Sequence, residues 1–200
     1  MPSASALSLL PVPASPSPAR ELATTVVFAA FIAVLGIFPG LYVGGSGVPI
    51  VVQNIGPLLA GAMLGARRGT AAVALLLALA AIGLPLLSGG RGGIAPFVGP
   101  SGGFLVGWLV SSLVVGLIVQ RSARPRLPLL LLAALAGLLV DYLIGIPWLW
   151  WYTGSFKTAA LGSLVFLPGD LAKVVITAVV AAVVHRALPG RFAGSAARTR

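Results

Sequence analysis

The chain has 200 residues, of which 58% are hydrophobic and only 8% are charged. Soluble domains carry about a quarter charged residues, so this composition excludes an ordinary globular protein and indicates a helical membrane protein. The net charge of +10 does not indicate a nucleic-acid partner, because the arginines lie between apolar segments, where they set membrane topology. The absence of cysteine excludes disulfides, thiolate metal ligands and cysteine nucleophiles.

Six apolar segments are candidates for membrane-spanning helices, which need about 20 residues each. Five prolines in residues 1–19 argue against a helix there and predict a disordered tail. Residues 20–188 are expected to form an all-α, six-helix membrane domain, followed by a basic tail at 189–200. The expected spans are 22–39, 48–65, 69–87, 104–120, 127–151 and 165–187. The second is short and interrupted by Gly56 and Pro57.

The basic residues are distributed asymmetrically between the two sides of these spans. With the N-terminus inside, ten of the 13 lysines and arginines fall in inner loops and tails. The outer loops hold only Arg91 and Lys157, and Lys173 lies within the last span. Positive charge accumulates on the cytoplasmic side, so both termini are predicted to be cytoplasmic in a multi-pass protein of a bacterial or archaeal-type plasma membrane.

Three charged residues lie well inside the expected spans, away from their ends: Asp141, Asp170 and Lys173. A charge at membrane depth costs roughly 3 kcal/mol even on lenient scales, and therefore indicates function. Asp170 and Lys173 are three residues apart on one helix face, where each reduces the desolvation cost of the other. The expected depths place all three at one level in the outer half, which predicts a pocket open to the outside.

The outer segment between Leu84 and Gly103 is rich in glycine and proline, which suits a shaped lid over a ligand. The expected lid residues are Gly89, Gly90, Gly92, Gly93, Gly99, Pro100, Gly102 and Gly103. Within it, Arg91 is either a ligand-binding cation or a solvated loop residue. Gln53, on the broken second span, is either a ligand contact or a loop amide.

Several motifs, in this order and spacing, resemble the BioY family of biotin-specific S components of energy-coupling factor (ECF) transporters. They are Gly47-Val-Pro-Ile50 with Gln53, Gly61-Ala-Met-Leu-Gly65, Gly89-Gly-Arg-Gly-Gly93, Gly99-Pro-Ser-Gly-Gly-Phe104, Gly145-Ile-Pro-Trp148 and Leu167-Pro-Gly-Asp-Leu-Ala-Lys173. Ser101 and Phe104 stand where the family usually has threonine and tyrosine.

The resemblance implies a transport subunit, not an enzyme, that binds biotin from outside and uses no cofactor of its own. Asp170 and Lys173 would be essential for binding. The implied partners are a transmembrane coupling protein and two ATPase subunits. Ala29 and Ala33, at the spacing of a small-residue helix face, would contact the coupling protein or pack within the bundle.

The ligand chemistry suggests how the charges are used. A buried Asp170–Lys173 pair offers an acceptor beside a donor, which matches the ureido edge of biotin, and Arg91 matches its carboxylate. The reverse assignment, with Lys173 on the carboxylate, stays open. Ser101 and Asp141 are further candidate contacts.

Two other functions fit much of this sequence. One is an S component for a different vitamin, and the other is a stand-alone secondary transporter of a small carboxylate. A Ser-His-Asp hydrolase is excluded, because the only histidine, His185, is expected on the cytoplasmic side.

Overall fold

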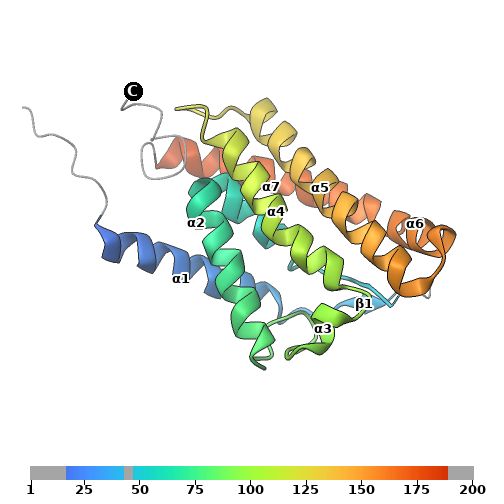
Figure 1. The fold of residues 1–200 in the computed structure, drawn as a ribbon. Helices are drawn as coiled ribbons and strands as arrows, with labels where there is room; N and C mark the ends of the chain where they lie inside the picture. The colour runs from blue at the N-terminus through green and yellow to red at the C-terminus, as the bar shows by residue number, and fades with distance from the viewer. Residues whose placement is uncertain (1–16, 43–46, 189–200) are drawn as a thin grey trace, which may run out of the picture.

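A computed structural model describes residues 17–42 and 47–188 of the chain (Figure 1). The described part is a bundle of helices with one small antiparallel strand pair. Its elements in chain order are α1 (Pro18–Leu35), β1 (Leu41–Tyr42), β2 (Pro49–Ile50), α2 (Ile55–Ala81), α3 (Ala95–Val98), α4 (Gly102–Val119), α5 (Leu127–Thr153), α6 (Phe156–Leu164) and α7 (Leu167–Ala187).

Five of these helices, α1, α2, α4, α5 and α7, are long and apolar enough to cross a membrane. The last three match the spans expected at 104–120, 127–151 and 165–187 to within two residues at each end. The first span begins earlier than expected. Ser17 caps its N-terminus by accepting a hydrogen bond from the Arg20 amide, and Pro18 occupies the first turn, where no amide hydrogen is needed.

The expected spans at 48–65 and 69–87 coincide with α2, and the structure corrects their boundaries. Residues 49–50 form a strand, and the helix begins only at Ile55. Gly56 and Pro57 therefore do not interrupt a span; they lie in the first turn of a helix, which tolerates proline. The real interruption is at Gly65, whose φ of 79° and ψ of −178° are not helical.

The chain reverses direction at Gly65. A Cβ built on Gly69 would lie 2.6 Å from the carbonyl oxygen of Ala60, whereas nine residues of straight helix would separate them by about 13 Å. The break frees two backbone groups, which side chains satisfy. Ala66 N–H donates to Gln120 Oε1 at 3.3 Å, and His185 Nε2 lies 3.0 Å from the Ala62 carbonyl oxygen. Helix α2 is thus a hairpin of two arms, 55–64 and 66–81.

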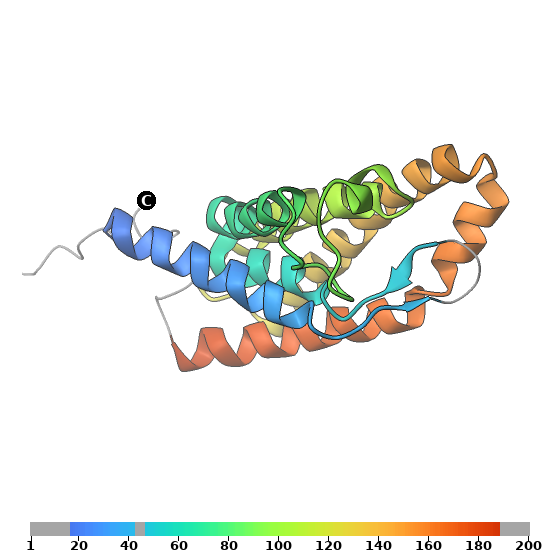
Figure 2. The same cartoon turned by 90° about the horizontal axis from the view of Figure 1, so that it is seen from below.

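Non-helical segments cover one end of the bundle (Figure 2). The β1–β2 pair joins Leu41 to Ile50 and Tyr42 to Pro49. The segment between α2 and α4 contains the short helix α3 and a tight turn in which Leu87 and Arg91 exchange two backbone hydrogen bonds of 3.0 Å. Helix α6 follows α5 after Gly154, whose φ of 70° ends that helix. The sequence analysis did not anticipate the strand pair, α3 or α6.

The predicted tails at 1–19 and 189–200 lie outside the described residues except for 17–19, which begin α1. The two alanines of the predicted coupling face on α1 differ in burial. Ala29 is only 4% exposed and packs in the main core cluster, while Ala33 is half-buried against a second cluster. Ala29 therefore packs within the bundle, and contact of this face with a coupling protein stays a prediction.

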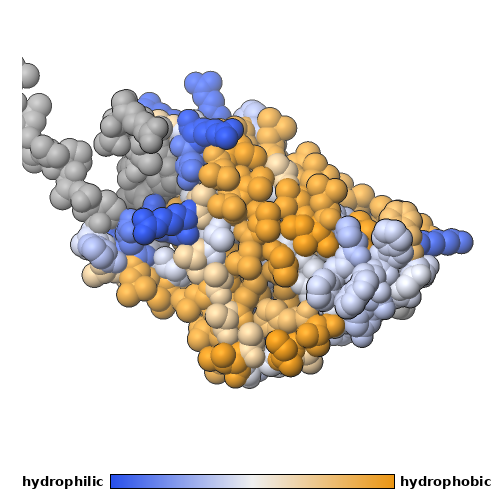
Figure 3. Space-filling model, viewed as in Figure 1, coloured by the Kyte–Doolittle hydropathy of each residue, from blue (hydrophilic) through white to orange (hydrophobic). Residues whose placement is uncertain are grey.

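The outer surface is apolar around its middle, with hydrophilic residues gathered towards the ends (Figure 3). On α5, Leu132, Leu139 and Leu143 are more than half exposed, at spacings that place them on one outward face. A surface with this many exposed leucines indicates contact with the hydrocarbon core of a membrane rather than with water. The chain is therefore a multi-pass membrane protein.

Candidate functional site

The charged pair expected in the last span is present at the start of α7. Lys173 Nζ lies 2.7 Å from Asp170 Oδ1 and also donates to the Val51 carbonyl at 2.7 Å. Asp170 is only 4% exposed. Two neutral donors from other helices complete its shell: Asn54 Nδ2 donates to Oδ1 at 3.0 Å, and the Tyr142 hydroxyl donates to Oδ2 at 2.8 Å. The carboxylate thus joins α2, α5 and α7.

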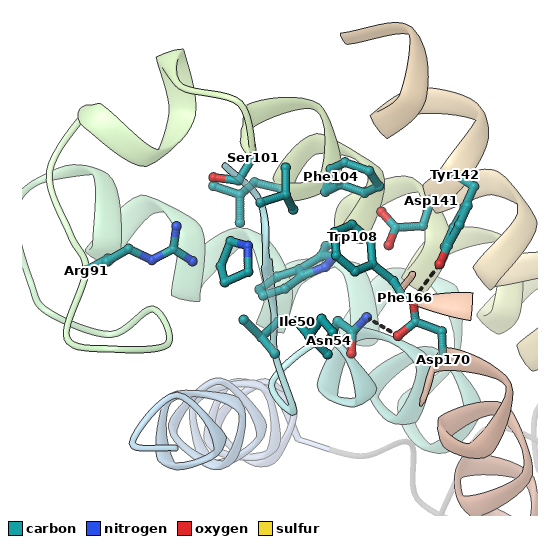
Figure 4. Close-up of a pocket in the computed structure, with 14 residues that line it drawn as sticks. Ile50, Asn54, Arg91, Ser101, Phe104, Trp108, Asp141, Tyr142, Phe166 and Asp170 are labelled. Carbon is teal, nitrogen blue, oxygen red and sulfur yellow. Dashed lines mark hydrogen bonds between the residues drawn. The ribbon is translucent and has the colours of Figure 1, made fainter. Parts of the chain in front are cut away.

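A cavity opens beside this pair (Figure 4). It holds about 510 Å³ of empty space, including its open mouth. Its polar lining residues are Asn54, Arg91, Ser101, Asp141, Tyr142 and Asp170, and its apolar lining includes Val48, Pro49, Ile50, Phe104, Trp108 and Phe166. A mostly apolar cavity with a few convergent polar groups is typical of a small-molecule site.

The cavity has two chemically different ends. Arg91 lies at one end, while Asp141, Tyr142 and Asp170 gather at the other (Figure 4). Aromatic rings form a wall near the acidic end, with Phe104 edge-on to both Tyr142 and Phe166 at centroid distances of 6.3 and 6.4 Å. Asp141 and Asp170, which were expected to lie near each other, both line this cavity, while their depth in the membrane stays a prediction. Lys173 is not among the lining residues and contacts the site through Asp170.

The glycines of the lid place Arg91 at the cavity. Gly89 and Gly90 have φ of 78° and 71°, which permits the tight turn between Leu87 and Arg91. Arg91 Nε donates to the Ser88 carbonyl at 3.0 Å, within the same turn. The remaining guanidinium nitrogens make no hydrogen bond with the described part of the chain. Arg91 is thus a cation with free donors at the cavity wall.

Gln53 does not line the cavity, contrary to its candidacy as a ligand contact. Its side chain is fully buried and joins three segments. Nε2 donates to the carbonyls of Ile32, at 3.0 Å, and Leu86, at 2.7 Å. Oε1 accepts from the Ser88 amide at 3.0 Å. Gln53 therefore holds the turn that carries Arg91, through hydrogen bonds to residues of that turn, and does not contact the cavity itself.

The second half of the lid is held by α5. Trp148 Nε1 donates to the Gly99 carbonyl at 2.9 Å. Gly102 and Gly103 pack so closely on Trp148 that a Cβ at either position would clash with its side chain. Ser101 lines the cavity and donates to the Pro96 carbonyl at 3.1 Å, while Pro100 lies close to Gly47, which precedes β2. Gly92 packs against Leu84, and Gly93, at φ 74°, allows another turn.

Asn54, Tyr142 and Trp108 are site residues that the sequence analysis missed. Each is a neutral polar or amphipathic side chain, so none was marked by a charge in an apolar run. One available signal was that Asn54 follows Gln53 and that Tyr142 follows Asp141. Two adjacent polar residues within an apolar segment indicate that both can face a polar site.

Comparison with known proteins places this chain among transport proteins. A profile described as the BioY family matches residues 5–190. The biotin transporter BioY of Rhizobium etli is 44% identical over 177 residues, covering 84% of this chain and 92% of that protein. The biotin transporter BioY of Rhodobacter capsulatus is 43% identical over 182 residues, covering 85% and 95%.

A solved structure shares the fold. The crystal structure of the S-component for biotin from an ECF-type ABC transporter superimposes with a TM-score of 0.80 at 34% identity. The match covers 86% of this chain and 95% of that one. Since the family profile and these relatives span most of its length, the chain belongs to the BioY family.

Proposed function

We propose that this protein binds biotin from the outer side of the membrane as the substrate-binding S component of an ECF-type transporter. The observation that carries the proposal is the cavity itself, with Arg91 at one end and, at the other, the buried Asp170, which pairs with Lys173 outside the lining. Biotin has the matching shape, with a carboxylate tail, an apolar ring system and a ureido head. The relatives with this fold are named as biotin transporters or as an S component for biotin.

Each end of the ligand meets a complementary group in this arrangement. Arg91 binds the carboxylate through its free guanidinium donors, in a charge-assisted hydrogen bond. Asp170 and the residues that it orders, Asn54 and Tyr142, hold the ureido end, and the contact with Lys173 holds the Asp170 side chain in place. Ser101 and the glycine turns hold the lid, while Gln53 supports it. Biotin is the cargo in this scheme, not a cofactor.

The partners follow from the proposed role. We expect one transmembrane coupling protein and two ATPase subunits, because a binding subunit of this kind supplies no energy for uptake. The membrane arrangement is six helices, counting the two arms of α2 separately, with both termini in the cytoplasm. The fold-back at Gly65 and the ten inner against two outer basic residues support it.

Mass spectrometry of the small molecule that co-purifies with the detergent-solubilised protein tests the ligand. Biotin bound at one equivalent is the expected result, and a different vitamin at that occupancy would refute the assignment. Titration with biotin and with biotin amide tests the orientation. Arg91→Ala should abolish the preference for free biotin over its amide, and Lys173→Met should leave a preference. The opposite pattern would place Lys173 on the carboxylate.

The topology can be tested by labelling, because the native chain has no cysteine. Single variants Ser3→Cys and Ser195→Cys should resist a membrane-impermeant maleimide in intact cells, and Lys157→Cys should react. Labelling of either terminal cysteine would refute the cytoplasmic placement. Uptake that continues without any ATPase subunit and collapses with an ionophore would instead identify a stand-alone secondary transporter.

A further inference from the structure

Asp141 is a buried carboxyl group that the contacts described so far leave unused. It lies on α5 with only 6% of its surface exposed, and it lines the cavity. None of the described residues donates a hydrogen bond to it, and its Oδ1 is completely buried without a partner. Asp170, in the same cavity wall, accepts three hydrogen bonds. Burying a carboxyl group without hydrogen-bond donors is energetically unfavourable, so its position in the cavity wall indicates that a bound ligand supplies a donor.

The neighbouring helix is shaped to admit this carboxyl group. Gly107 of α4 packs directly on Asp141, so that a Cβ at Gly107 would overlap Oδ1. No side chain from α4 can reach the carboxyl group from that side. Asp141 lines the cavity, and its carboxyl group points towards it (Figure 4), so that a ligand can reach this group.

Two more unpaired groups lie on the same side of the cavity, away from Arg91 (Figure 4). Asn54 uses its amide nitrogen on Asp170, which leaves its buried Oδ1 without a donor in the described structure. Trp108 is 5% exposed and lines the cavity, and its indole N–H has no acceptor in the parts of the chain described. Two open acceptors and one open donor are the complement of an –NH–CO–NH– edge, which has two donors and one acceptor.

We infer that Asp141 is a specificity-determining residue whose carboxylate accepts a hydrogen bond from one ureido N–H, while Asn54 accepts from the other. This inference rests on the proposed function and adds to it the carboxyl group that recognises the ureido N–H groups. Asp141 thereby rejects ligands that present an acceptor or a methyl group at that nitrogen. In the free protein the carboxyl group has no hydrogen-bond donor among the described residues, and the ligand supplies the missing donor.

The test pairs variants with ligands that lack one donor each. Biotin and its two mono-N-methyl ureido derivatives are titrated by calorimetry into purified protein in detergent. The proteins are wild type, Asp141→Leu, Asp141→Asn and the matched control Thr177→Val. Thr177 is also buried with an unpartnered side-chain oxygen, but it lies outside the cavity lining. Removing its hydroxyl should leave all three affinities unchanged.

We expect Asp141→Leu to weaken biotin binding by about 10- to 100-fold, the loss typical of a hydrogen bond to a charged group. Methylation of the nitrogen that faces Asp141 should then cost nothing further, whereas methylation of the other nitrogen should cost as much as in the wild type. Wild-type affinity in Asp141→Leu, or full penalties for both methyl groups, would overturn the inference.

Asp141→Asn keeps the shape and an oxygen acceptor, so it serves if the leucine variant does not fold. Its uncharged oxygen is a weaker acceptor, and we expect a fall of about 3- to 10-fold with a reduced penalty at the same nitrogen. Unchanged binding and unchanged penalties would overturn the inference. If the wild type binds biotin but the Asp141 variants keep the full penalty for both methyl groups, only the role of Asp141 is refuted. If the wild type binds no biotin, the proposed function fails as well.

Discussion

Removing the lysine of the buried pair should damage folding more than removing both charges. In Lys173→Met, Asp170 loses an ammonium 2.7 Å away and keeps only two neutral donors, from Asn54 and Tyr142. With 4% of the residue exposed, water cannot replace the lost cation. Stranding a buried charge in this way costs about 3–5 kcal/mol. The Val51 carbonyl also loses its donor, which adds to the loss.

The double variant Asp170→Asn/Lys173→Met removes both charges of this pair, so neither is left without its partner. Exchanging a whole ion pair for neutral groups of similar volume is often close to neutral for stability. We therefore expect the double variant to recover at least about 2 kcal/mol relative to Lys173→Met. Biotin affinity should not recover, because the group that orders Asn54 and Tyr142 has been changed.

The measurements are unfolding of the ligand-free protein in detergent and titration of biotin into each variant. Lys157→Met is the matched control, since Lys157 is exposed on α6, away from the cavity lining. A double variant as unstable as the sum of its single variants would show that Asp170 and Lys173 do not compensate each other. A double variant that binds biotin like the wild type would show that the pair does not hold the ligand.

Four further variants test the supports of the site. Gln53→Leu should lower the free energy of unfolding by about 2–4 kcal/mol, because buried groups of Ile32, Leu86 and Ser88 lose their hydrogen-bond partner. Hydrogen exchange of the backbone amides at 86–91 should become faster. Unchanged exchange would show that Gln53 does not hold this turn. Gly65→Ala should cost about 1–3 kcal/mol, measured by unfolding, because φ 79° with ψ −178° is a backbone conformation essentially restricted to glycine. Gly69→Ala should cost more, because its Cβ meets Ala60. Trp148→Phe keeps an aromatic ring against Gly103 but removes the hydrogen bond to the Gly99 carbonyl. Biotin should then dissociate about 5- to 10-fold faster in stopped-flow measurements. An unchanged dissociation rate would show that this hydrogen bond does not hold the lid.

The acidic end of the site could be predicted from the sequence because a charge in an apolar run is conspicuous. Asp141, Asp170 and Lys173 were found in this way, and the helical spacing of Asp170 and Lys173 predicted their contact, which is confirmed. The neutral partners could not be found by the same signal. Asn54 and Tyr142 reach Asp170 from positions 116 and 28 residues away, a relation that appears only in the folded chain.

Helix boundaries within one apolar region were harder to predict. Residues 48–81 are hydrophobic almost throughout, so composition does not separate strand, turn and helix there. Glycines occur at 56, 61, 65 and 69 and look alike in sequence. They differ in surroundings: Gly65 makes the turn, whereas Gly61 and Gly69 only allow close packing. Proline at 57 suggested a break but occupies a first turn instead.

The short first arm of α2 explains why a cavity exists at this place. Residues 55–64 extend for about 15 Å as a helix, which is half of a hydrocarbon core of about 30 Å. A longer helix here would occupy the space where the cavity lies. Instead, the strand pair and the glycine-rich segment lie at this end of the bundle, and residues of both line the cavity. The early end of this arm also leaves Asn54 at its tip beside Asp170. A truncated helix thus provides both the empty space and one of the polar groups that line it.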